Sequence, residues 1–98
     1  MIYADLDYAP HYSDLHAELV ELIEANFAET QHGLQGDSWI WIFEDGEKVA
    51  IDSFSSMKHQ VKSDSREGRL ARNVIALLAQ HYRVIEYAQP ELEPHEDD

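Results

Sequence analysis

The stretch DSWIWIFEDGEKVAIDSF, residues 37–54, decides the fold. Two runs of strand-forming residues flank Asp45-Gly46, a pair that suits the positive φ angles of a type I′ turn. We therefore expect a β-hairpin with Asp45 and Gly46 as its two loop residues. This loop sets a register in which Ile42 lies opposite Val49. Four aliphatic residues then share one face of the hairpin: Ile40, Ile42, Val49 and Ile51.

The other face of this hairpin carries an aromatic stripe, formed by Trp39, Trp41 and Phe43. The residues across from them in the same register are Asp52, Ala50 and Lys48. If helices bury the aliphatic side, the stripe points away from them and needs a cover. Two interpretations stay open. Either another part of the chain folds across the rings, or the rings form an interaction surface.

Periodicity predicts the elements that precede the hairpin. Alternating apolar residues predict a strand over residues 2–8. Apolar residues three and four apart then predict a helix over residues 13–32. Ser13 suits the N-cap of that helix, and Gly33 suits a left-handed stop at its C-terminus.

Three elements are expected after the hairpin. Residues 56–62 alternate, which predicts either a third strand or an extension of the second strand beyond a bulge. Asp64 and Glu67 have the spacing of a capping box, so a second helix is expected over residues 65–81. Residues 82–88, with Val and Ile at their centre, predict a last strand that ends before Pro90.

These elements predict one α+β domain over residues 1–88, followed by an acidic, disordered tail over residues 89–98. We expect a two-layer sandwich with two helices on one face of a four- to five-stranded, mainly antiparallel sheet. The element order is similar to the ferredoxin-like βαββαβ arrangement, with a β-meander variant as the alternative. That arrangement is a superfold, and a resemblance to it implies no function.

Composition excludes several classes of function. Among 98 residues, 20 Asp and Glu stand against seven Lys and Arg, which gives a net charge of −13. Such a charge repels phosphate backbones and anionic lipid, so binding to nucleic acid or membranes is not expected. The chain has no cysteine, which rules out disulfides and thiolate chemistry. No apolar run approaches 18 residues and no signal peptide is recognisable, so we expect a cytoplasmic protein.

The few cations are concentrated in one segment. Five of the seven lie between residues 58 and 72: Lys58, Lys62, Arg66, Arg69 and Arg72. Arg66 and Arg69 fall in the first turns of the second predicted helix, where the helix dipole disfavours a cation. One hypothesis is an anion-binding site formed by Lys62, Arg66, Arg69 and Arg72. The favoured alternative is that these residues pair with carboxylates elsewhere in an acidic molecule.

The acidic surface has two interpretations as well. Glu18, Glu21 and Glu24 follow one another at three-residue steps along the first predicted helix. Such residues usually form a solvated surface. The alternative is electrostatic capture of a basic partner, as an immunity protein or antitoxin does.

The sequence offers no convincing catalytic or metal site. Six histidines are present, but no two are four residues apart and no His-Glu-x-x-His run occurs, so no metal is expected. His16 lies too close to Ser13 and Asp14 on one helical turn to form a catalytic triad. His59 is interpreted as an ordinary strand residue, and the carboxylates of Asp5, Asp7 and Asp52 as rim residues.

We therefore expect a non-catalytic protein-protein interaction module without a cofactor, which homodimerises through Trp39, Trp41 and Phe43. The first alternative is an acidic inhibitor that captures a basic protein partner. The second is a small domain that binds an anionic ligand through the Arg-rich start of the second helix.

Overall fold

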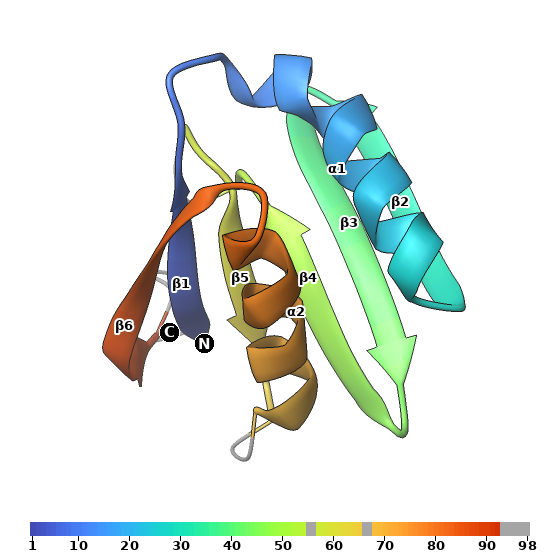
Figure 1. Cartoon of the computed structure of the whole chain (residues 1–98), viewed down its shortest axis with the longest axis vertical. Helices are drawn as coiled ribbons and strands as arrows, with labels where there is room; N and C mark the ends of the chain where they lie inside the picture. Colours follow the sequence, from blue (N-terminus) through green and yellow to red (C-terminus); the bar gives the residue numbers. More distant parts are fainter. Residues whose placement is uncertain (55–56, 66–67, 93–98) are drawn as a thin grey trace.

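The computed structural model describes residues 1–54, 57–65 and 68–92. This part of the chain forms six strands and two helices (Figure 1). In chain order they are β1 (Ile2–Asp7), α1 (Tyr12–Asn26), β2 (Glu29–Gln35), β3 (Asp37–Glu44), β4 (Glu47–Asp52), β5 (Gln60–Ser63), α2 (Arg69–Ala79) and β6 (Arg83–Glu91). The strands form one open sheet in the order β2-β3-β4-β5-β1-β6, and every neighbouring pair is antiparallel. The expected α+β class is confirmed.

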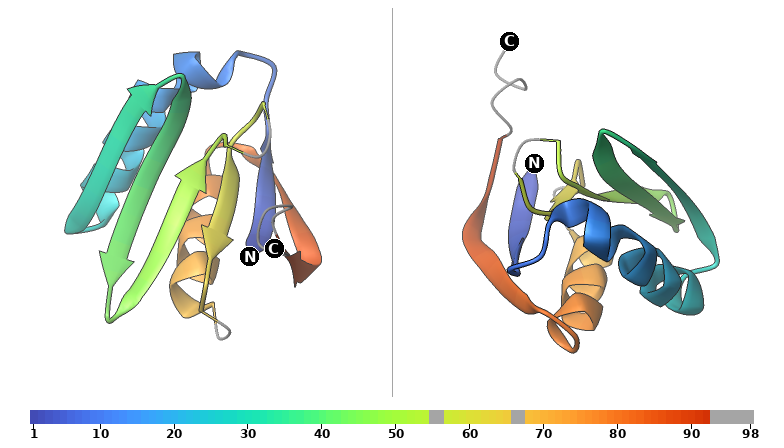
Figure 2. Two further views of the ribbon diagram at one scale, coloured as in Figure 1. Left: turned by 180° about the vertical axis from the view of Figure 1, so that it is seen from behind. Right: turned by 90° about the horizontal axis from the view of Figure 1, so that it is seen from above.

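Both helices lie on the same face of the sheet, so the molecule has two layers (Figure 1, Figure 2). α1 packs against β2 and β3, whereas α2 packs against β4, β5 and β6. Each helix therefore covers a different half of the inner face. The Cα atoms span 29 × 27 × 24 Å, with the sheet extending along the two longer directions (Figure 1).

The hairpin forms in the predicted register. Ile42 pairs with Val49, Ile40 pairs with Ile51, and the aromatic residues pair across the other face as expected. Asp45 and Gly46 make the turn with φ angles of 51° and 80°. Positive φ at both central residues gives the turn the twist that the flanking strands require.

The core lies between the helices and the aliphatic face of the hairpin, as predicted. Ile40, Ile42, Val49 and Ile51 are at most 1% exposed. Among the five buried residues of each helix, three are spaced four apart: Leu15, Leu19 and Ile23 in α1, and Leu70, Val74 and Leu78 in α2. Ala4 and Leu6 of β1 and Val61 of β5 complete the cluster.

The sheet is larger than the sequence predicts. It has six strands rather than four or five, and the ferredoxin-like order is not confirmed. One reason is that the first helix ends at Asn26 rather than at residue 32, and Phe27 is already extended (φ −130°, ψ 138°). Residues 29–35 then form β2, which pairs with β3 along its whole length. The N-cap is also displaced, because the His11 side chain accepts a hydrogen bond from the Ser13 backbone N–H.

β5 decides between the two interpretations of the segment that follows the hairpin. Of the segment 56–62, residue 56 lies outside the described residues, and the strand begins only at Gln60. It is a separate strand between β4 and β1, not an extension of β4. α2 begins at Arg69 after Gly68 (φ 61°), without a side-chain cap, so the predicted capping box of Asp64 and Glu67 does not start the helix. Glu67 itself lies outside the described residues.

The last strand also differs from its prediction. β6 continues through Pro90 to Glu91 instead of ending at residue 88. Because β6 is an edge strand, Pro90 does not need to donate to a further neighbour. Of the predicted tail, residues 93–98 lie outside the described residues. In the described part of the chain, no helix has both the length and the apolar character to cross a membrane.

The turn geometry predicts the effect of one substitution. Nothing lies within 4 Å of a Cβ added to Gly46, so Gly46→Ala causes no clash. Its only destabilising effect is that alanine must adopt a positive φ of 80°. We expect a loss of about 1–2 kcal/mol in the free energy of unfolding, measured by urea denaturation. Asp45→Asn is the control and should change stability little, because asparagine tolerates the same conformation. An unaltered stability of Gly46→Ala would contradict the assigned turn.

Candidate functional site

Trp39, Trp41 and Phe43 alternate with the core residues of β3 and therefore lie on the sheet face opposite the helices, which we call the aromatic face. The left view of Figure 2 shows the sheet from this side. The side chains of these three residues are only partly buried. The ring centroids of Trp39 and Trp41 are 4.5 Å apart with an interplanar angle of 38°. The Lys48 ammonium lies 3.9 Å from the Trp41 centroid, within the range of a cation–π contact. The rings thus form one continuous patch.

Gly33 of β2 makes room for this patch. A Cβ at Gly33 would lie 2.4 Å from a ring carbon of Trp39, so the indole rests directly on the glycine backbone. Gly33 lies opposite Trp39 in the pairing of β2 with β3. Its predicted role as a helix stop is therefore wrong, and its absent side chain serves packing instead.

The centre of the aromatic face is unusually poor in acidic side chains for this chain. Gln31 pairs with Trp41 from one side, and Ala50 pairs with it from the other. The carboxylates of β2 and β3 on this face belong to Glu29 and Asp37, which lie near the ends of their strands. The carboxylates of β2 and β3 thus border the patch without entering its centre.

One carboxylate beside Trp39 is neutralised by a buried ion pair. The Lys62 Nζ lies 2.5 Å from the Asp52 Oδ1, and the two side chains are 8% and 6% exposed. Asp52 was expected as a rim residue, and that expectation is wrong. Removal of one partner from such a pair leaves an uncompensated buried charge, which costs about 3–5 kcal/mol.

The far part of the same face holds a second polar cluster. Asp5 accepts hydrogen bonds from the Gln60 side-chain amide and from the Tyr87 hydroxyl, each at 2.8 Å. Burial and this hydrogen bond raise the pKa of Tyr87 to about 12. Asp7 pairs with Lys58 at 3.1 Å. Asp5 and Asp7 are therefore bound to other residues rather than poised as a pair of catalytic carboxylates.

The three described members of the predicted anion-binding set do not share one face of the molecule. Lys62 lies on the aromatic face, paired with Asp52. Arg69 and Arg72 are exposed on α2, which covers the opposite face. Arg66 lies outside the described residues.

Sequence analysis missed a buried hydrogen-bonded chain that joins α1, β3 and the segment before β5. The Ser38 hydroxyl lies 2.6 Å from the His16 Nδ1 and 2.7 Å from the His59 Nε2. The His59 Nδ1 lies 2.7 Å from the Tyr8 hydroxyl, which also accepts the His59 backbone N–H. One direction of donation satisfies every group, from Tyr8 through neutral His59 and Ser38 to His16.

The surroundings of His59 and His16 in this hydrogen-bonded network favour their neutral forms. Burial and the nearby His16 lower the pKa of His59 from 6.5 to about 4. Burial and His32 likewise lower the pKa of His16. Ser38 and His59 are both 0% exposed, so no substrate reaches the serine hydroxyl in this conformation. The arrangement ties α1 to the sheet, and His59 is not the ordinary strand residue that its sequence position suggests.

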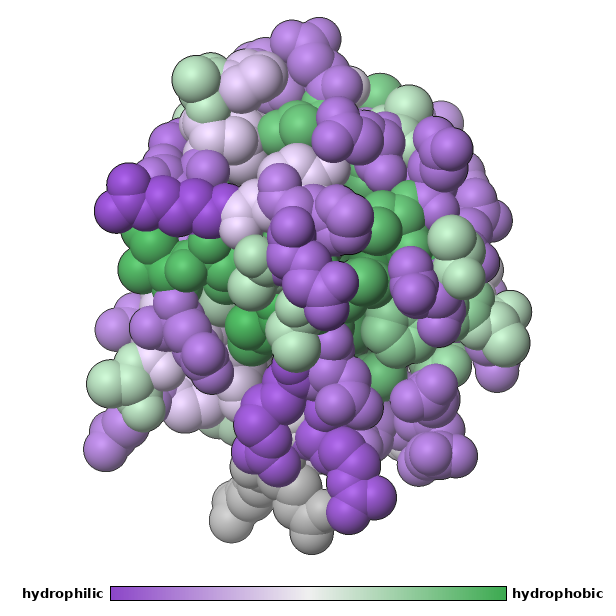
Figure 3. Space-filling view, in the orientation of Figure 1, coloured by the Kyte–Doolittle hydropathy of each residue, from purple (hydrophilic) through white to green (hydrophobic). Residues whose placement is uncertain are grey.

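The helix side of the molecule has a different chemistry. Hydrophilic residues predominate where the helices face the viewer, with hydrophobic residues between them (Figure 3). Two hollows flank α1 there, and Glu21 and Ala25 line both of them. Within the described part of the chain, no group of three or more His, Asp or Glu residues lies close enough to hold a metal ion.

Comparison with known proteins adds no assignment to this geometry. No protein-family model, curated protein or solved structure matches the chain. The interpretation of its surfaces therefore rests on their own chemistry.

The contact between Gly33 and Trp39 can be tested by Gly33→Ala. The added Cβ must displace the indole, so we expect a loss of about 1–3 kcal/mol in unfolding free energy and a shifted tryptophan emission maximum. Gly36→Ala is the control for tryptophan emission, because nothing lies within 4 Å of its Cβ. An unshifted emission maximum in Gly33→Ala would contradict the indole's position on the glycine.

The buried histidine predicts a pH-dependent stability. His59 is harder to protonate in the folded state, so its contribution is complete above about pH 6.5 and decreases as pH falls toward 4. At about 1.4 kcal/mol per pKa unit, the loss amounts to roughly 3 kcal/mol. Urea denaturation at pH 7 and pH 5 should show a smaller difference in His59→Gln than in the wild type. The exposed His81→Gln control should keep the wild-type difference, and an equal difference in all three proteins would refute the assignment.

Proposed function

We propose that this protein is a non-catalytic interaction module that forms a homodimer through the aromatic face. The observation that supports the proposal is the close, tilted pair of indoles of Trp39 and Trp41 on the side of the sheet away from both helices. Partly buried aromatic rings on a sheet face gain free energy when a partner removes their remaining surface from water. A two-fold pairing lets one such patch cover its own copy.

The dimensions of the sheet favour this proposal. The two longer Cα extents of the molecule, along which the sheet lies, are 29 and 27 Å, so the sheet face is at most comparable in area to the roughly 800 Å² per partner of a typical stable interface. The three aromatic rings would form the apolar centre, and the polar ends of β2 and β3 would form the rim. This division matches the usual anatomy of protein interfaces.

Charge supports a second copy as the occupant despite a net charge of −13. Long-range repulsion between copies is screened within about 8–10 Å at physiological salt. At short range, the centre of the aromatic face offers Lys48 rather than a carboxylate, and Asp52 is already paired with Lys62. The aromatic centres of two copies can therefore meet without burying opposed negative charges there.

The proposal predicts a concentration-dependent mass. In multi-angle light scattering, the wild type should move from monomer to dimer as its concentration rises. Trp41→Ala should weaken the dimer by about 2 kcal/mol, or roughly 30-fold in the dissociation constant. Leu34→Ala is the matched control, because Leu34 is also an exposed apolar residue, at 44%, but it pairs with the buried Ser38 and therefore lies on the helix side of the sheet.

Two results would overturn the homodimer. One is a monomeric mass for the wild type at every concentration tested. The other is a dimer that Trp41→Ala and Leu34→Ala weaken equally, because the contact would then not be specific to the aromatic face.

A further inference from the structure

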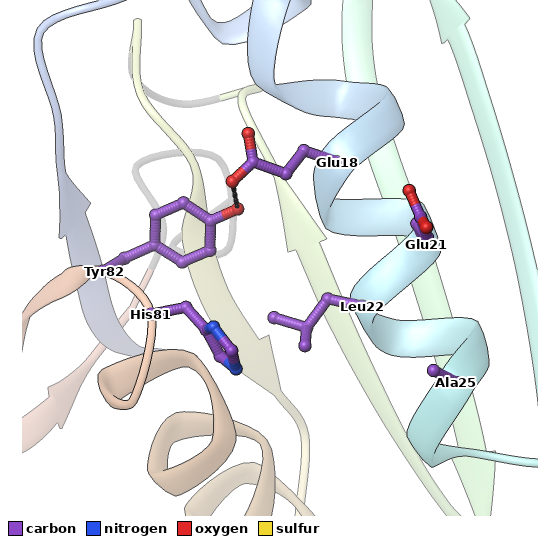
Figure 4. A pocket seen from close by; sticks show the side chains of 6 residues that line it. All are labelled: Glu18, Glu21, Leu22, Ala25, His81 and Tyr82. Carbon is purple, nitrogen blue, oxygen red and sulfur yellow. Dashed lines mark hydrogen bonds between the residues drawn. The ribbon is translucent and has the colours of Figure 1, made fainter.

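A hollow of about 310 Å³ lies between α1 and the turn that follows α2 (Figure 4). Its lining residues are Glu18, Glu21, Leu22, Ala25, His81 and Tyr82. The side chain of Leu22 and the ring of Tyr82 give it an apolar interior. The Tyr82 hydroxyl donates to the Glu18 Oε1 at 2.8 Å, which fixes this carboxylate at the edge (Figure 4). The hollow therefore combines an apolar wall, an aromatic ring and an oriented anion.

A second hollow, of about 620 Å³, lies on the other side of the same helix. It is lined by His16, Ala17, Val20, Glu21, Glu24, Ala25 and His32. Glu21 and Ala25 belong to both hollows, so they form a ridge between them. Ala17 and Ala25 have small side chains, so the surface of α1 protrudes little at these two positions. A single extended or helical segment laid across the ridge could place one side chain in each hollow.

The charge of α1 is uncompensated along this ridge. The helix contains four carboxylates, Asp14, Glu18, Glu21 and Glu24, and no lysine or arginine. Among the described residues, none of the four makes an ion pair with a Lys or Arg side chain. The Lys and Arg side chains that do form ion pairs contact Asp7 and Asp52 of the sheet instead. The ridge thus presents a concentrated negative charge beside apolar walls.

Lysine and arginine side chains match both properties. Each has an apolar stem that packs against aliphatic side chains and a cationic end that stays near the surface. The arginine guanidinium can bind a carboxylate with two parallel hydrogen bonds and can also lie against an aromatic ring. A volume of about 310 Å³ is at the lower end of ligand sites, which suits one long side chain rather than a large cofactor.

We propose that the two hollows and the Glu21 ridge bind an arginine-rich segment of a partner protein. One guanidinium lies against the Tyr82 ring and donates to the Glu18 carboxylate oxygen that Tyr82 does not contact, and a second lies near Glu24 in the larger hollow. This site is on the helix side of the sheet, whereas the proposed dimer contact is on the other side. A dimer would therefore present two such sites, and binding of the basic segment does not depend on dimerisation.

The test is a nuclear magnetic resonance titration of the full ¹⁵N-labelled chain with a defined peptide. The probe is an acetylated, amidated peptide of sequence Arg-Ala-Leu-Arg-Ala-Leu, at about 20 mM salt to limit screening. A matched peptide with citrulline in place of arginine keeps the shape and removes the charge. We expect the arginine peptide to shift the amide signals of Leu22, Ala25 and Tyr82, and the citrulline peptide to leave them in place.

Variants separate a built site from general attraction to an acidic protein. Glu21→Gln, which changes both hollows, should lower the affinity for the arginine peptide about fivefold or more. Glu44→Gln removes one exposed carboxylate at the hairpin end and should lower the affinity for the arginine peptide less than about twofold. Trp41→Ala should bind as the wild type does, whatever its effect on the dimer.

Three results would overturn the proposal. The citrulline peptide could cause the same shifts, which would exclude charge recognition. Glu21→Gln and Glu44→Gln could weaken binding equally, which would reduce the effect to net charge. The arginine peptide could also leave Leu22, Ala25 and Tyr82 unchanged at low salt, which would exclude the hollow as its site.

Discussion

The pairing of β3 with β4 is the constraint on which the rest of the structure depends. In an antiparallel pair with a two-residue turn, the register decides which side chains share a face. Here it places Ile40, Ile42, Val49 and Ile51 on one side, and the three aromatic residues of β3 on the other. A shift by one residue would direct the indoles toward the helices and expose the aliphatic residues. The core and the aromatic face are therefore two results of one register.

The same division separates two kinds of surface chemistry. The helix side is acidic because α1 carries four carboxylates. The aliphatic core lies beneath this helix. The sheet side is aromatic at its centre, and its buried carboxylate Asp52 is neutralised by Lys62. The proposed dimer contact and the proposed cationic partner would therefore occupy opposite sides of the molecule. Electrostatic repulsion between copies then acts mainly away from the proposed contact.

Local patterns predicted the parts of the fold that depend on local physics. Asp45-Gly46 predicted the turn, and most of the apolar residues three and four apart in α1 and α2 are buried. β2 was not predictable in this way, because its sequence ETQHGLQ has no alternation of apolar and polar residues. Its strand conformation comes from hydrogen bonding to β3, a tertiary effect that overrides weak local preference. Gly33, within this polar segment, was the one signal of close packing.

The polar contacts escaped prediction for the same reason. His16, Ser38 and His59 are distant in the sequence and meet only after α1 docks on the sheet. The Asp52–Lys62 pair likewise depends on β5 lying beside β4. Of the candidate sites, the aromatic stripe was predictable because alternation alone places its residues. The hollows beside α1 were not, since their walls come from α1, β2 and the turn after α2.

Collisional quenching of tryptophan fluorescence by acrylamide, at low and high protein concentration, tests the central claim most directly. The account predicts that both indoles are accessible to the quencher in dilute solution and become protected as the concentration rises. Protection that is already complete in dilute solution and does not change with concentration would mean that the monomer covers its own tryptophans. That result would contradict the aromatic face as a contact surface.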